Sequence, residues 1–340
     1  MRNKYLAAAL VAGVSCLAVQ AHADNSWADN TKLGGKMYVD FTNINTQQDG
    51  TNVDPYGLGL DVKRFYIGVD HKFDDMWSAN FTTDFNYSSA DKNTQVYVKK
   101  AFVQAHWSDA ANLRLGSADM PWIPFAEDMY QYRFVENTLI DRLHFGNSAD
   151  WGVHFLGKSG IANYAVSVVN GGGYHNPSRS KGEDVEGRVA FTPVDGLTIA
   201  LGGYSGKRGL DTEAVPAIHT ASRLDALVNY RISSFHVGME YFSADNWTAV
   251  AKTPTDKADG YSLFGDYTFA PGMAVFARYD SAKPNKDTNP SLKDTYYNAG
   301  VSFKSNDQIT WAVAYKSEKL ADNTTELKTN EIGVWAQIAF

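Results

Sequence analysis

The sequence has only one cysteine, Cys16, so it cannot form an internal disulfide. It also lacks the run of roughly 20 apolar residues that a membrane-spanning helix needs, which excludes a helical inner-membrane protein. The formal net charge of −7 leaves no surplus of basic residues for a nucleic-acid surface. These absences exclude a disulfide-rich scaffold, a helical membrane protein and a nucleic-acid partner.

The first 23 residues read as a cleaved secretory signal peptide. Arg2 and Lys4 precede an apolar stretch over residues 6–19, and Ala21-His22-Ala23 fits an A-x-A cleavage site. The apolar stretch is too short for a membrane anchor. Cys16 lies inside this segment, and Gly13 stands where a lipoprotein signal would have leucine. We therefore expect a mature domain over residues 24–340, without cysteine and with a net charge of −9.

Apolar and polar residues alternate in short runs along the whole mature chain. In one run the apolar face is Trp77, Ala79, Phe81, Thr83 and Phe85, and the opposite face is Ser78, Asn80, Thr82 and Asp84. The last such run, residues 331–340, ends on Phe340. A period of two is typical of strands with one apolar face. A closing strand that ends on an aromatic residue is similar to the assembly signal of outer-membrane barrels.

Short and long connections alternate between these runs. Short turns are predicted at 74–75, 109–112, 159–160, 193–196, 233–234, 271–272 and 305–307. Longer polar loops are predicted at 43–56, 88–94, 118–149, 170–182, 205–222, 243–259, 281–292 and 317–326. Together they connect about 16 strands, which predicts an all-β fold, a transmembrane antiparallel β-barrel of a Gram-negative outer membrane. The strands of a soluble β-sandwich or β-propeller would also alternate apolar and polar residues, but these folds would not explain the regular alternation of short turns and long loops.

Two segments carry a family resemblance. Leu113-Arg114-Leu115-Gly116 is followed by Pro121, by Arg133-Phe134-Val135-Glu136 and by Gly152-Val153, and an arginine-bearing strand, Lys63 to Val69, comes earlier. This arrangement resembles the phosphate-selective porin O/P family, most closely over residues 60–160. The resemblance implies a homotrimeric 16-stranded porin in the lipid bilayer whose long third loop folds into the lumen and narrows it.

That third loop would be residues 118–149, the longest connection in the chain. It carries large side chains such as Trp122, Phe125 and Tyr130, which could pack against an interior wall. A long loop without strand pattern is usually functional or disordered. The alternative is an external loop that covers the barrel mouth or contacts a neighbouring protomer.

Charged residues on the inward strand faces and in this loop are the candidate selectivity residues. The predicted pore-lining or constriction residues are Arg64, Lys100, Arg114, Glu127, Asp128, Arg133, Glu136, Arg142, Arg188 and Arg278. The resemblance implies an arginine ladder, for which Arg64, Arg114, Arg133, Arg188 and Arg278 are the candidates. Nearly as many carboxylates share the same faces, including Asp84, Glu186, Asp225, Glu240 and Asp280, which departs from the family pattern. For each arginine the alternative role is a wall ion pair.

The sequence thus predicts passive diffusion of small hydrophilic solutes or ions, with a leaning towards anions or phosphate. A general, cation-leaning or sugar porin of the same architecture is the alternative, and a plugged structural barrel is another. An enzyme is disfavoured because the histidines are scattered without a recurrent Ser or Asp companion and without metal-ligand spacing. Gly171-Gly172-Gly173 is followed by no helix pattern and is no phosphate-binding motif. We expect no catalytic residue, cofactor or metal.

Overall fold

The computed structural model describes residues 26–88 and 93–340, so the predicted signal peptide lies outside the described residues. Among the described residues, no helix combines the length and apolar character needed to cross a membrane. The short helix α2 (Ser26–Asp29) precedes the first strand. The strands are β1 (Thr31–Gln48), β2 (Thr51–Lys72), β3 (Trp77–Ser88), β4 (Asn93–Ser108), β5 (Ala111–Asp119), β6 (Ala149–Ser159), β7 (Ala162–Val169), β8 (Asp184–Val194), β9 (Leu197–Gly206), β10 (Ala221–Ile232), β11 (Phe235–Asp245), β12 (Lys257–Ala270), β13 (Met273–Lys283), β14 (Lys293–Lys304), β15 (Ile309–Ala321) and β16 (Glu326–Ala339).

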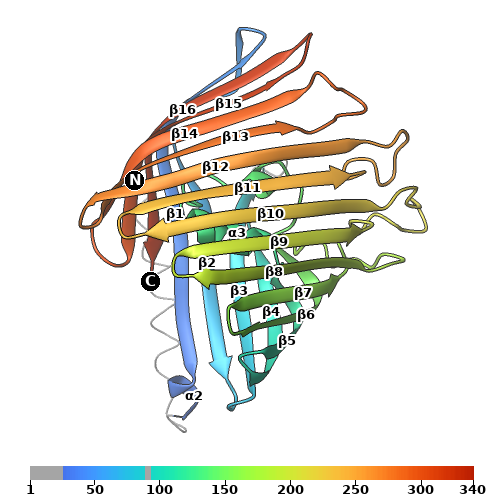
Figure 1. Cartoon of the computed structure of the whole chain (residues 1–340), viewed down its shortest axis with the longest axis vertical. Helices are drawn as coiled ribbons and strands as arrows, with labels where there is room; N and C mark the ends of the chain where they lie inside the picture. The colour runs from blue at the N-terminus through green and yellow to red at the C-terminus, as the bar shows by residue number, and fades with distance from the viewer. Residues whose placement is uncertain (1–25, 89–92) are drawn as a thin grey trace, which may run out of the picture.

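The 16 strands form one closed antiparallel barrel in which each strand pairs with its neighbours in sequence (Figure 1). Closure comes from β1 and β16, which pair from Lys36–Ala339 to Gln48–Leu327. Phe340 then exchanges two backbone hydrogen bonds with Gly35, at 2.8 and 3.0 Å. The predicted strand number, the antiparallel barrel and the closing role of the last strand are confirmed. Because the barrel is closed, both edges of every strand are hydrogen-bonded to a neighbouring strand, as a hydrocarbon environment requires.

The seven short turns are confirmed, but two of the predicted long loops are wrong. The predicted loop over residues 43–56 is a two-residue hairpin, because β1 continues to Gln48 and β2 begins at Thr51. Asp49 and Gly50 both have positive φ, 50° and 81°, as a tight Asp-Gly turn requires. The predicted loop over 317–326 is likewise reduced to residues 322–325. The outer ends of these strands extend beyond the apolar band and are polar. Their composition therefore predicted loops.

The strand faces separate apolar from polar residues, as the alternation predicted. On β13, Val275 and Tyr279 are 44% and 37% exposed, whereas Phe276, Arg278 and Asp280 between and beside them are buried. In a closed barrel the exposed apolar set faces outward and the buried polar set faces inward. The outward set therefore faces the lipid.

A bulge modifies this parity in β2. The register between β1 and β2 shifts between Tyr38 and Val39, which leaves Lys63 as an extra residue. Arg64 stays opposite Tyr38 on the inward face, and the ammonium group of Lys63 also reaches the buried carboxylate of Asp40, at 3.3 Å. Because Lys63 and Arg64 are consecutive, a strict period of two predicts that only one of these cations faces inward.

Candidate functional site

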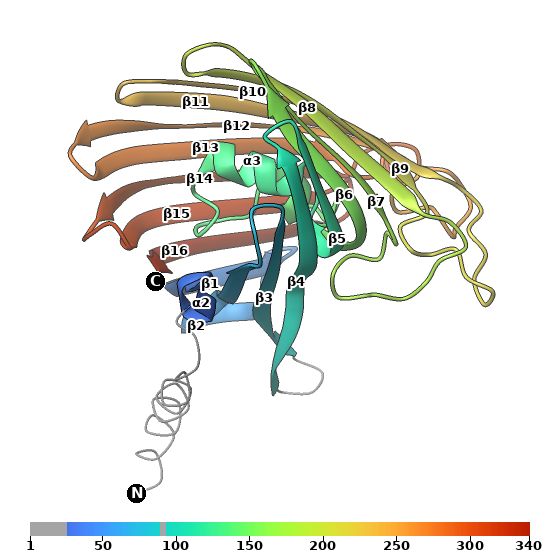
Figure 2. The same ribbon diagram turned by 90° about the horizontal axis from the view of Figure 1, so that it is seen from below.

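Residues 120–148, between β5 and β6, form the longest connection without strand structure, as predicted. The strands take residues 118, 119 and 149, so this segment is slightly shorter than the predicted 118–149. It contains α3 (Ile123–Tyr130) and α4 (Leu139–Arg142). Proline in the first turn starts α3, and Gln131 in a left-handed conformation ends it by donating its N–H to the Glu127 carbonyl. Figure 2 shows α3 with strands on both sides of it.

Apolar side chains attach this segment to the inward faces of β8–β11. Trp122, Ile123, Leu139, Ile140 and Phe145 are almost completely buried in one cluster with Leu227 and Phe242 of the barrel strands and Trp247 of the β11–β12 loop. A second cluster joins Tyr130, Tyr132, Phe134 and Val135 to Phe264, Phe276 and Trp335. The ring of Tyr132 stacks on that of Phe276, with centroids 4.1 Å apart. The segment is therefore packed against the barrel wall with a core of its own.

Trp122 joins the segment to two wall carboxylates. Its backbone N–H donates to Glu186 Oε1 at 2.9 Å, and its Nε1–H donates to Glu240 Oε1 at 2.8 Å. All three side chains are almost completely buried. A buried carboxylate without such donors would be strongly destabilising, so these bonds fix the start of α3 to β8 and β11.

Replacing Trp122 with Phe is expected to lower the free energy of unfolding by about 1–3 kcal/mol, because it removes the donor to buried Glu240. The measurement is the urea midpoint of the barrel in detergent micelles. Trp311→Phe is the matched control, since Trp311 Nε1 donates to Ser305 at the exposed rim. Equal effects of the two substitutions would contradict the anchoring role.

Arg223 makes a second connection in the same region. Its guanidinium pairs with Asp225 at 2.8 Å and with Glu186 at 2.9 Å, and it also donates to the carbonyl of Phe145. A β-carbon at residue 146 would lie 2.7 Å from this guanidinium, so any side chain larger than glycine would have to displace Arg223. The end of the segment is thus tied to β8 and β10 by a fully buried charge.

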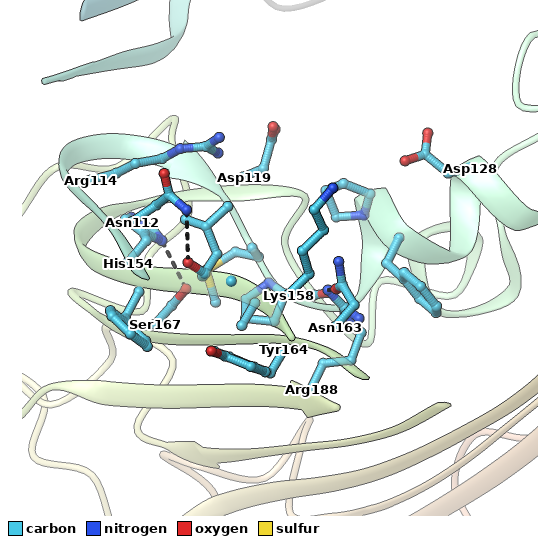
Figure 3. A pocket seen from close by; sticks show the side chains of 18 of the residues that line it. Asn112, Arg114, Asp119, Asp128, His154, Lys158, Asn163, Tyr164, Ser167 and Arg188 are labelled. Atoms are coloured by element: carbon cyan, nitrogen blue, oxygen red, sulfur yellow. Dashed lines mark hydrogen bonds between the residues drawn. The ribbon is translucent and has the colours of Figure 1, made fainter. Parts of the chain in front are cut away.

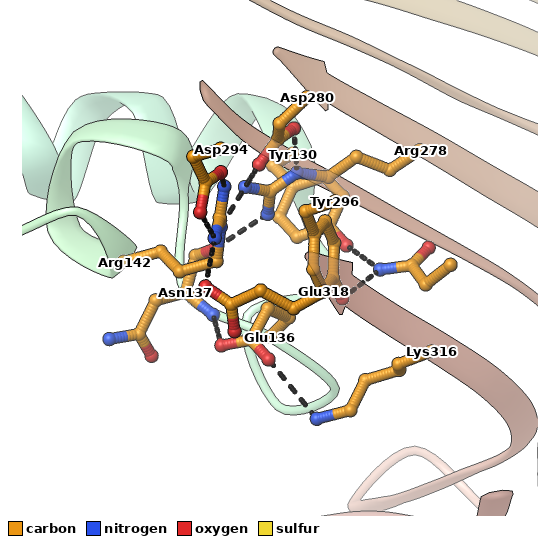
Figure 4. A network of polar contacts seen from close by, with 11 residues as sticks. Tyr130, Glu136, Asn137, Arg142, Arg278, Asp280, Asp294, Tyr296, Lys316 and Glu318 are labelled. Carbon is orange, nitrogen blue, oxygen red and sulfur yellow. Dashed lines mark hydrogen bonds and ion pairs between the residues drawn. The ribbon is translucent and has the colours of Figure 1, made fainter. Parts of the chain in front are cut away.

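A larger network ties α4 to β13–β15 (Figure 4). Arg142 pairs with Asp280 at 3.2 Å, with Asp294 at 2.5 Å and with Glu318 at 2.6 Å. Arg278 pairs with Asp280 at 2.6 Å and donates to the carbonyl of Asn137. The side chains of Arg142 and Arg278 are only 5% and 1% exposed. These two predicted pore-lining arginines therefore have little contact with solvent and are neutralised by wall carboxylates.

Glu136 extends the network on the side of β15 and β16. Its carboxylate accepts a hydrogen bond from the Lys316 ammonium group at 3.1 Å, and Lys316 also pairs with Glu331 at 2.6 Å. Burial alone would raise the pKa of Glu136, but the Lys316 ammonium and the Asn137 backbone N–H outweigh it and hold that pKa at about 2. Glu136, like Arg142 and Arg278, was predicted to line the pore and is thus instead ion-paired to the barrel wall.

This low pKa predicts acid sensitivity. Because the folded-state pKa of Glu136 is below its unfolded value, the stabilisation is present above about pH 4.5 and is lost as the pH falls through about 2. Glu136→Gln is expected to lower the urea midpoint at pH 7 by the equivalent of about 1–3 kcal/mol and to have little effect at pH 2. The exposed pair partner Glu213, changed to Gln, is the control. A Glu136→Gln deficit that is constant with pH would contradict this assignment.

Arg133 lies where the segment faces β1 and β2. It pairs with Glu127 at 2.6 Å and with Asp141 at 3.4 Å, and its guanidinium lies 6.0 Å from the ring of Tyr38. Opposite it, Arg64 lies 3.8 Å from Asp84. The predicted constriction residues Glu127, Arg133 and Arg64 are thus brought together, with carboxylates beside both arginines.

The other predicted wall cations differ in how far they are neutralised. Lys100 pairs with Asp119 at 2.9 Å. Arg114 donates to Gln104 at 2.7 Å and lies over the ring of Phe102. Arg188 donates to the Pro121 carbonyl at 2.8 Å and to Asn163 at 2.7 Å, with Phe125 beneath it. Neither Arg114 nor Arg188 forms an ion pair within the described part of the chain.

Three adjoining cavities lie between the segment and the wall. Their volumes are about 430, 480 and 610 Å³. The first is lined by Arg114, His154 and Arg188, and Figure 3 shows Arg114 at the upper left of the group of side chains and Arg188 at its lower edge. The exposed carboxylate of Asp128 lines all three cavities. The nearby protein displaces part of the water around this exposed carboxylate, and this partial desolvation, with the Glu127 charge next, raises the pKa of Asp128.

The sequence interpretation predicted the loop over residues 170–182 but missed that it contributes side chains near Arg64. In the loop after β7, Gly171 and Gly173 have φ of 88° and 76°, and a side chain at 171 would collide with Asp184. The tight turn is held by the Gly173 N–H, which donates to Asp150 at 3.0 Å. It brings Tyr174 and His175 against Tyr97, with His175 and Tyr97 ring centroids 4.1 Å apart. The glycine run, rejected as a phosphate motif, was the available signal for this turn.

The described residues show no cluster of three or more His, Cys, Asp or Glu side chains arranged to hold a metal ion. His154 is buried and bonded to Ser167 Oγ at 2.8 Å. His236 lies between Asp266 and Asn229, at 2.5 and 2.6 Å. Both histidines have wall partners. His154 does neighbour a hydroxyl, but Ser167 is almost completely buried, and the second ring nitrogen of His154 faces the Gly116 carbonyl at 3.3 Å. The geometry at both is that of a hydrogen-bonded wall residue.

Comparisons with known proteins agree with this architecture. Residues 31–216 match the family model described as phosphate-selective porin O and P. An anion-selective porin from Comamonas acidovorans is 14% identical with a TM-score of 0.65, covering 91% of this chain and 99% of that one. OmpF of Salmonella typhi, solved with daunomycin, is 12% identical with a TM-score of 0.64, covering 92% and 99%. OmpT of Vibrio cholerae, an outer-membrane protein with one structure in a trimer form, is 14% identical with a TM-score of 0.60, covering 91% and 99%. No curated protein matches the chain at a significant level.

Proposed function

The chain belongs to the phosphate-selective porin O and P family and is an outer-membrane channel, and we propose that it passes small hydrophilic solutes passively with a weak preference for anions. Residues 120–148 narrow the channel in this proposal, since they attach to the inward faces of β8–β16 and have three cavities beside them. The cleaved signal peptide, the mature barrel over residues 24–340 and a homotrimeric assembly are parts of the same proposal.

The observation that carries the anion preference is the balance of unpaired charge around the three cavities. Among the described residues, the lining cations without an ion pair are Lys36, Lys99, Arg114, Arg188 and Lys304. The lining carboxylates without one are Asp70, Asp128 and Asp307. An ion-paired charge contributes little to the field that a permeating ion meets, whereas an unpaired one acts over several ångströms in a narrow pore. Five unpaired cations against three carboxylates favour anions weakly.

A dedicated arginine ladder has less support. Of its five candidate members, Arg278 is buried against Asp280, and Arg133 pairs with two carboxylates. Arg64 has Asp84 nearby. Only Arg114 and Arg188 keep an unpaired guanidinium, the group that could hold phosphate with two parallel hydrogen bonds. A phosphate-preferring channel would depend on these two residues.

A catalytic role has no support in the site. The cavities hold His106 and His154, and the described contacts of these residues are with Asn112, Ser167 and the Gly116 backbone. A hydrolase would need an accessible nucleophile within hydrogen-bond reach of a base that a third group orients. Ser167 lies within reach of His154, but its side chain is almost completely buried, and no carboxylate bonds to His154 among the described residues. We propose that the protein is a channel without enzymatic activity.

The zero-current potential in a planar bilayer under a potassium chloride gradient tests the proposal. The parent channel is expected to show chloride preference. Arg114→Gln with Arg188→Gln leaves three unpaired cations against three carboxylates, so this variant is expected to lose the preference. Lys72→Gln is the control, because Lys72 pairs with Asp75 at the rim. A parent channel that prefers potassium would contradict the proposal.

Added phosphate separates the two forms of the proposal. Block of chloride current by millimolar phosphate, lost in the Arg114 and Arg188 variant, would establish a phosphate site at these arginines. Chloride preference without block would establish a general anion-leaning porin.

A further inference from the structure

The outward face of β12–β15 carries a repeated Tyr–Lys pattern. Each strand has an exposed tyrosine and an exposed lysine four residues further towards the rim with the long loops. The pairs are Tyr261 with Lys257, Tyr279 with Lys283, Tyr297 with Lys293, and Tyr315 with Lys319. An even spacing of four keeps both side chains on the lipid-facing side of each strand.

The tyrosines mark the depth of the row. They lie beside one another across neighbouring strands, with Tyr279 opposite Tyr297 in register and the Tyr261 and Tyr279 rings 6.3 Å apart. Such an outward aromatic band lies at the edge of the hydrocarbon layer. Four residues span about 13 Å along a strand, or about 9 Å along the membrane normal at a 45° tilt. The lysines therefore reach the layer of lipid headgroups.

The lysines are crowded and only partly neutralised. Lys319 lies directly opposite Lys328 in the β15–β16 register, and like charges in this position repel each other. Lys283 and Lys293 follow the last pair of the β13–β14 ladder, Ala282 and Asp294. Lys319 pairs with Glu326, and Lys286 pairs with Asp259. Lys257 and Lys283 lie opposite Asp245 and Asp259 in register, but neither forms an ion pair within the described residues, and nor does Lys293.

The row is confined to one arc of the barrel. At the corresponding outward positions, β11 ends with Asp245 and β9 with Ser205, and β1 has Asn45 and Gln47. The long loops lie at this rim, and in outer-membrane barrels they are extracellular. The surplus positive charge on β12–β16 thus faces the headgroups of the outer leaflet.

We propose that Lys257, Lys283, Lys293, Lys319 and Lys328 form a docking surface for phosphorylated lipid headgroups of the outer leaflet. Phosphate groups on membrane-anchored lipids are held at the depth of the row and complement its charge. The tyrosines below contact the start of the acyl chains and present hydroxyl groups to the headgroup. The surface is separate from the channel, because the lysines and the cavity residues lie on opposite faces of the wall.

The experiment titrates the detergent-solubilised full chain with diphosphoryl lipid A at 50 mM salt and counts bound lipid by native mass spectrometry. Each lysine near a charged lipid surface contributes enough that removing two should weaken binding by about 30-fold. Lys283→Gln with Lys293→Gln is therefore expected to bind about 30-fold more weakly than the parent. The control is Lys181→Gln with Lys252→Gln, which removes the same charge from exposed loop positions and is expected to bind like the parent.

Four results would overturn the proposal. Unchanged binding by the Lys283 and Lys293 variant would remove the row from the site, and an equal loss in the control would indicate general attraction. Equal binding of a dephosphorylated lipid with the same acyl chains would indicate an apolar contact only. Displacement by 50 mM inorganic phosphate would indicate a free-phosphate site instead. Unchanged single-channel conductance of each variant confirms that the barrel is folded.

Discussion

Deleting residues 123–141 should raise the single-channel conductance at least about twofold, because the deleted residues fill the barrel between the cavities and the wall of β8–β16. The deletion removes α3 and most of α4 together with Tyr130, Tyr132 and Phe134 of the second buried cluster, whereas Trp122 and Phe145 of the first cluster remain. The uncovered wall is mixed. Phe264, Phe276 and Trp335 lose apolar contacts, while Arg278 and Lys316 would face water, where charged groups are well solvated. The strand pairing that closes the barrel is untouched. The barrel is therefore expected to stay closed and to conduct.

The geometry of the strand ends makes this deletion practicable. Asp119 and Ala149 are register partners at the ends of β5 and β6, so their backbones are adjacent. The residues left between them, 120–122 and 142–148, are more than enough for a hairpin connection. A deletion of residues 212–216 from the exposed loop after β9 serves as the control and should leave conductance unchanged. Unchanged conductance after removal of residues 123–141 would mean that this segment does not restrict the pore.

The sequence was informative about the barrel because strand alternation is a local property. Each run of about ten residues must show one face to lipid, so Val275 and Tyr279 mark an outward face without knowledge of their neighbours. The same parity placed Asp40, Asp84, Glu240 and Asp280 inward, where they are buried. It was less informative where a bulge adds a residue, as at Lys63, or where a strand continues past the membrane into polar residues, as at Asp49-Gly50.

The candidate site was harder to predict because its interactions join distant parts of the chain. Arg142 and Glu318 are 176 residues apart, and no local pattern indicates that they pair. Sequence parity identified Arg278 as inward, but only the contact with Asn137 and Asp280 shows that its charge is neutralised. Asp294 and Glu318 lie near the outer strand ends and were absent from the predicted pore residues. Inward position is therefore a weak predictor of contact with the permeating ion.

Replacing Arg142 with Met should destabilise the barrel by about 3–5 kcal/mol, because one partner of a buried ion-pair network is removed. Asp280, Asp294 and Glu318 would then share only Arg278, which already serves Asp280. Methionine keeps the packing against Tyr296, whose ring lies 4.7 Å from the guanidinium, so the loss is mainly electrostatic. The urea midpoint of unfolding measures it, and fluctuating single-channel current should accompany the weakened attachment of α4.

A compensated variant separates charge imbalance from loss of packing. Adding Asp294→Asn and Glu318→Gln to Arg142→Met removes two of the three stranded carboxylates and should recover at least half of the lost midpoint. A double-mutant cycle then gives the coupling between α4 and the wall. Arg133→Met is the comparison, since Arg133 pairs with two carboxylates of its own segment and should affect stability less. If the compensated variant is no more stable than Arg142→Met alone, the network does not hold α4 through charge, and packing by Leu139 and Ile140 must do so.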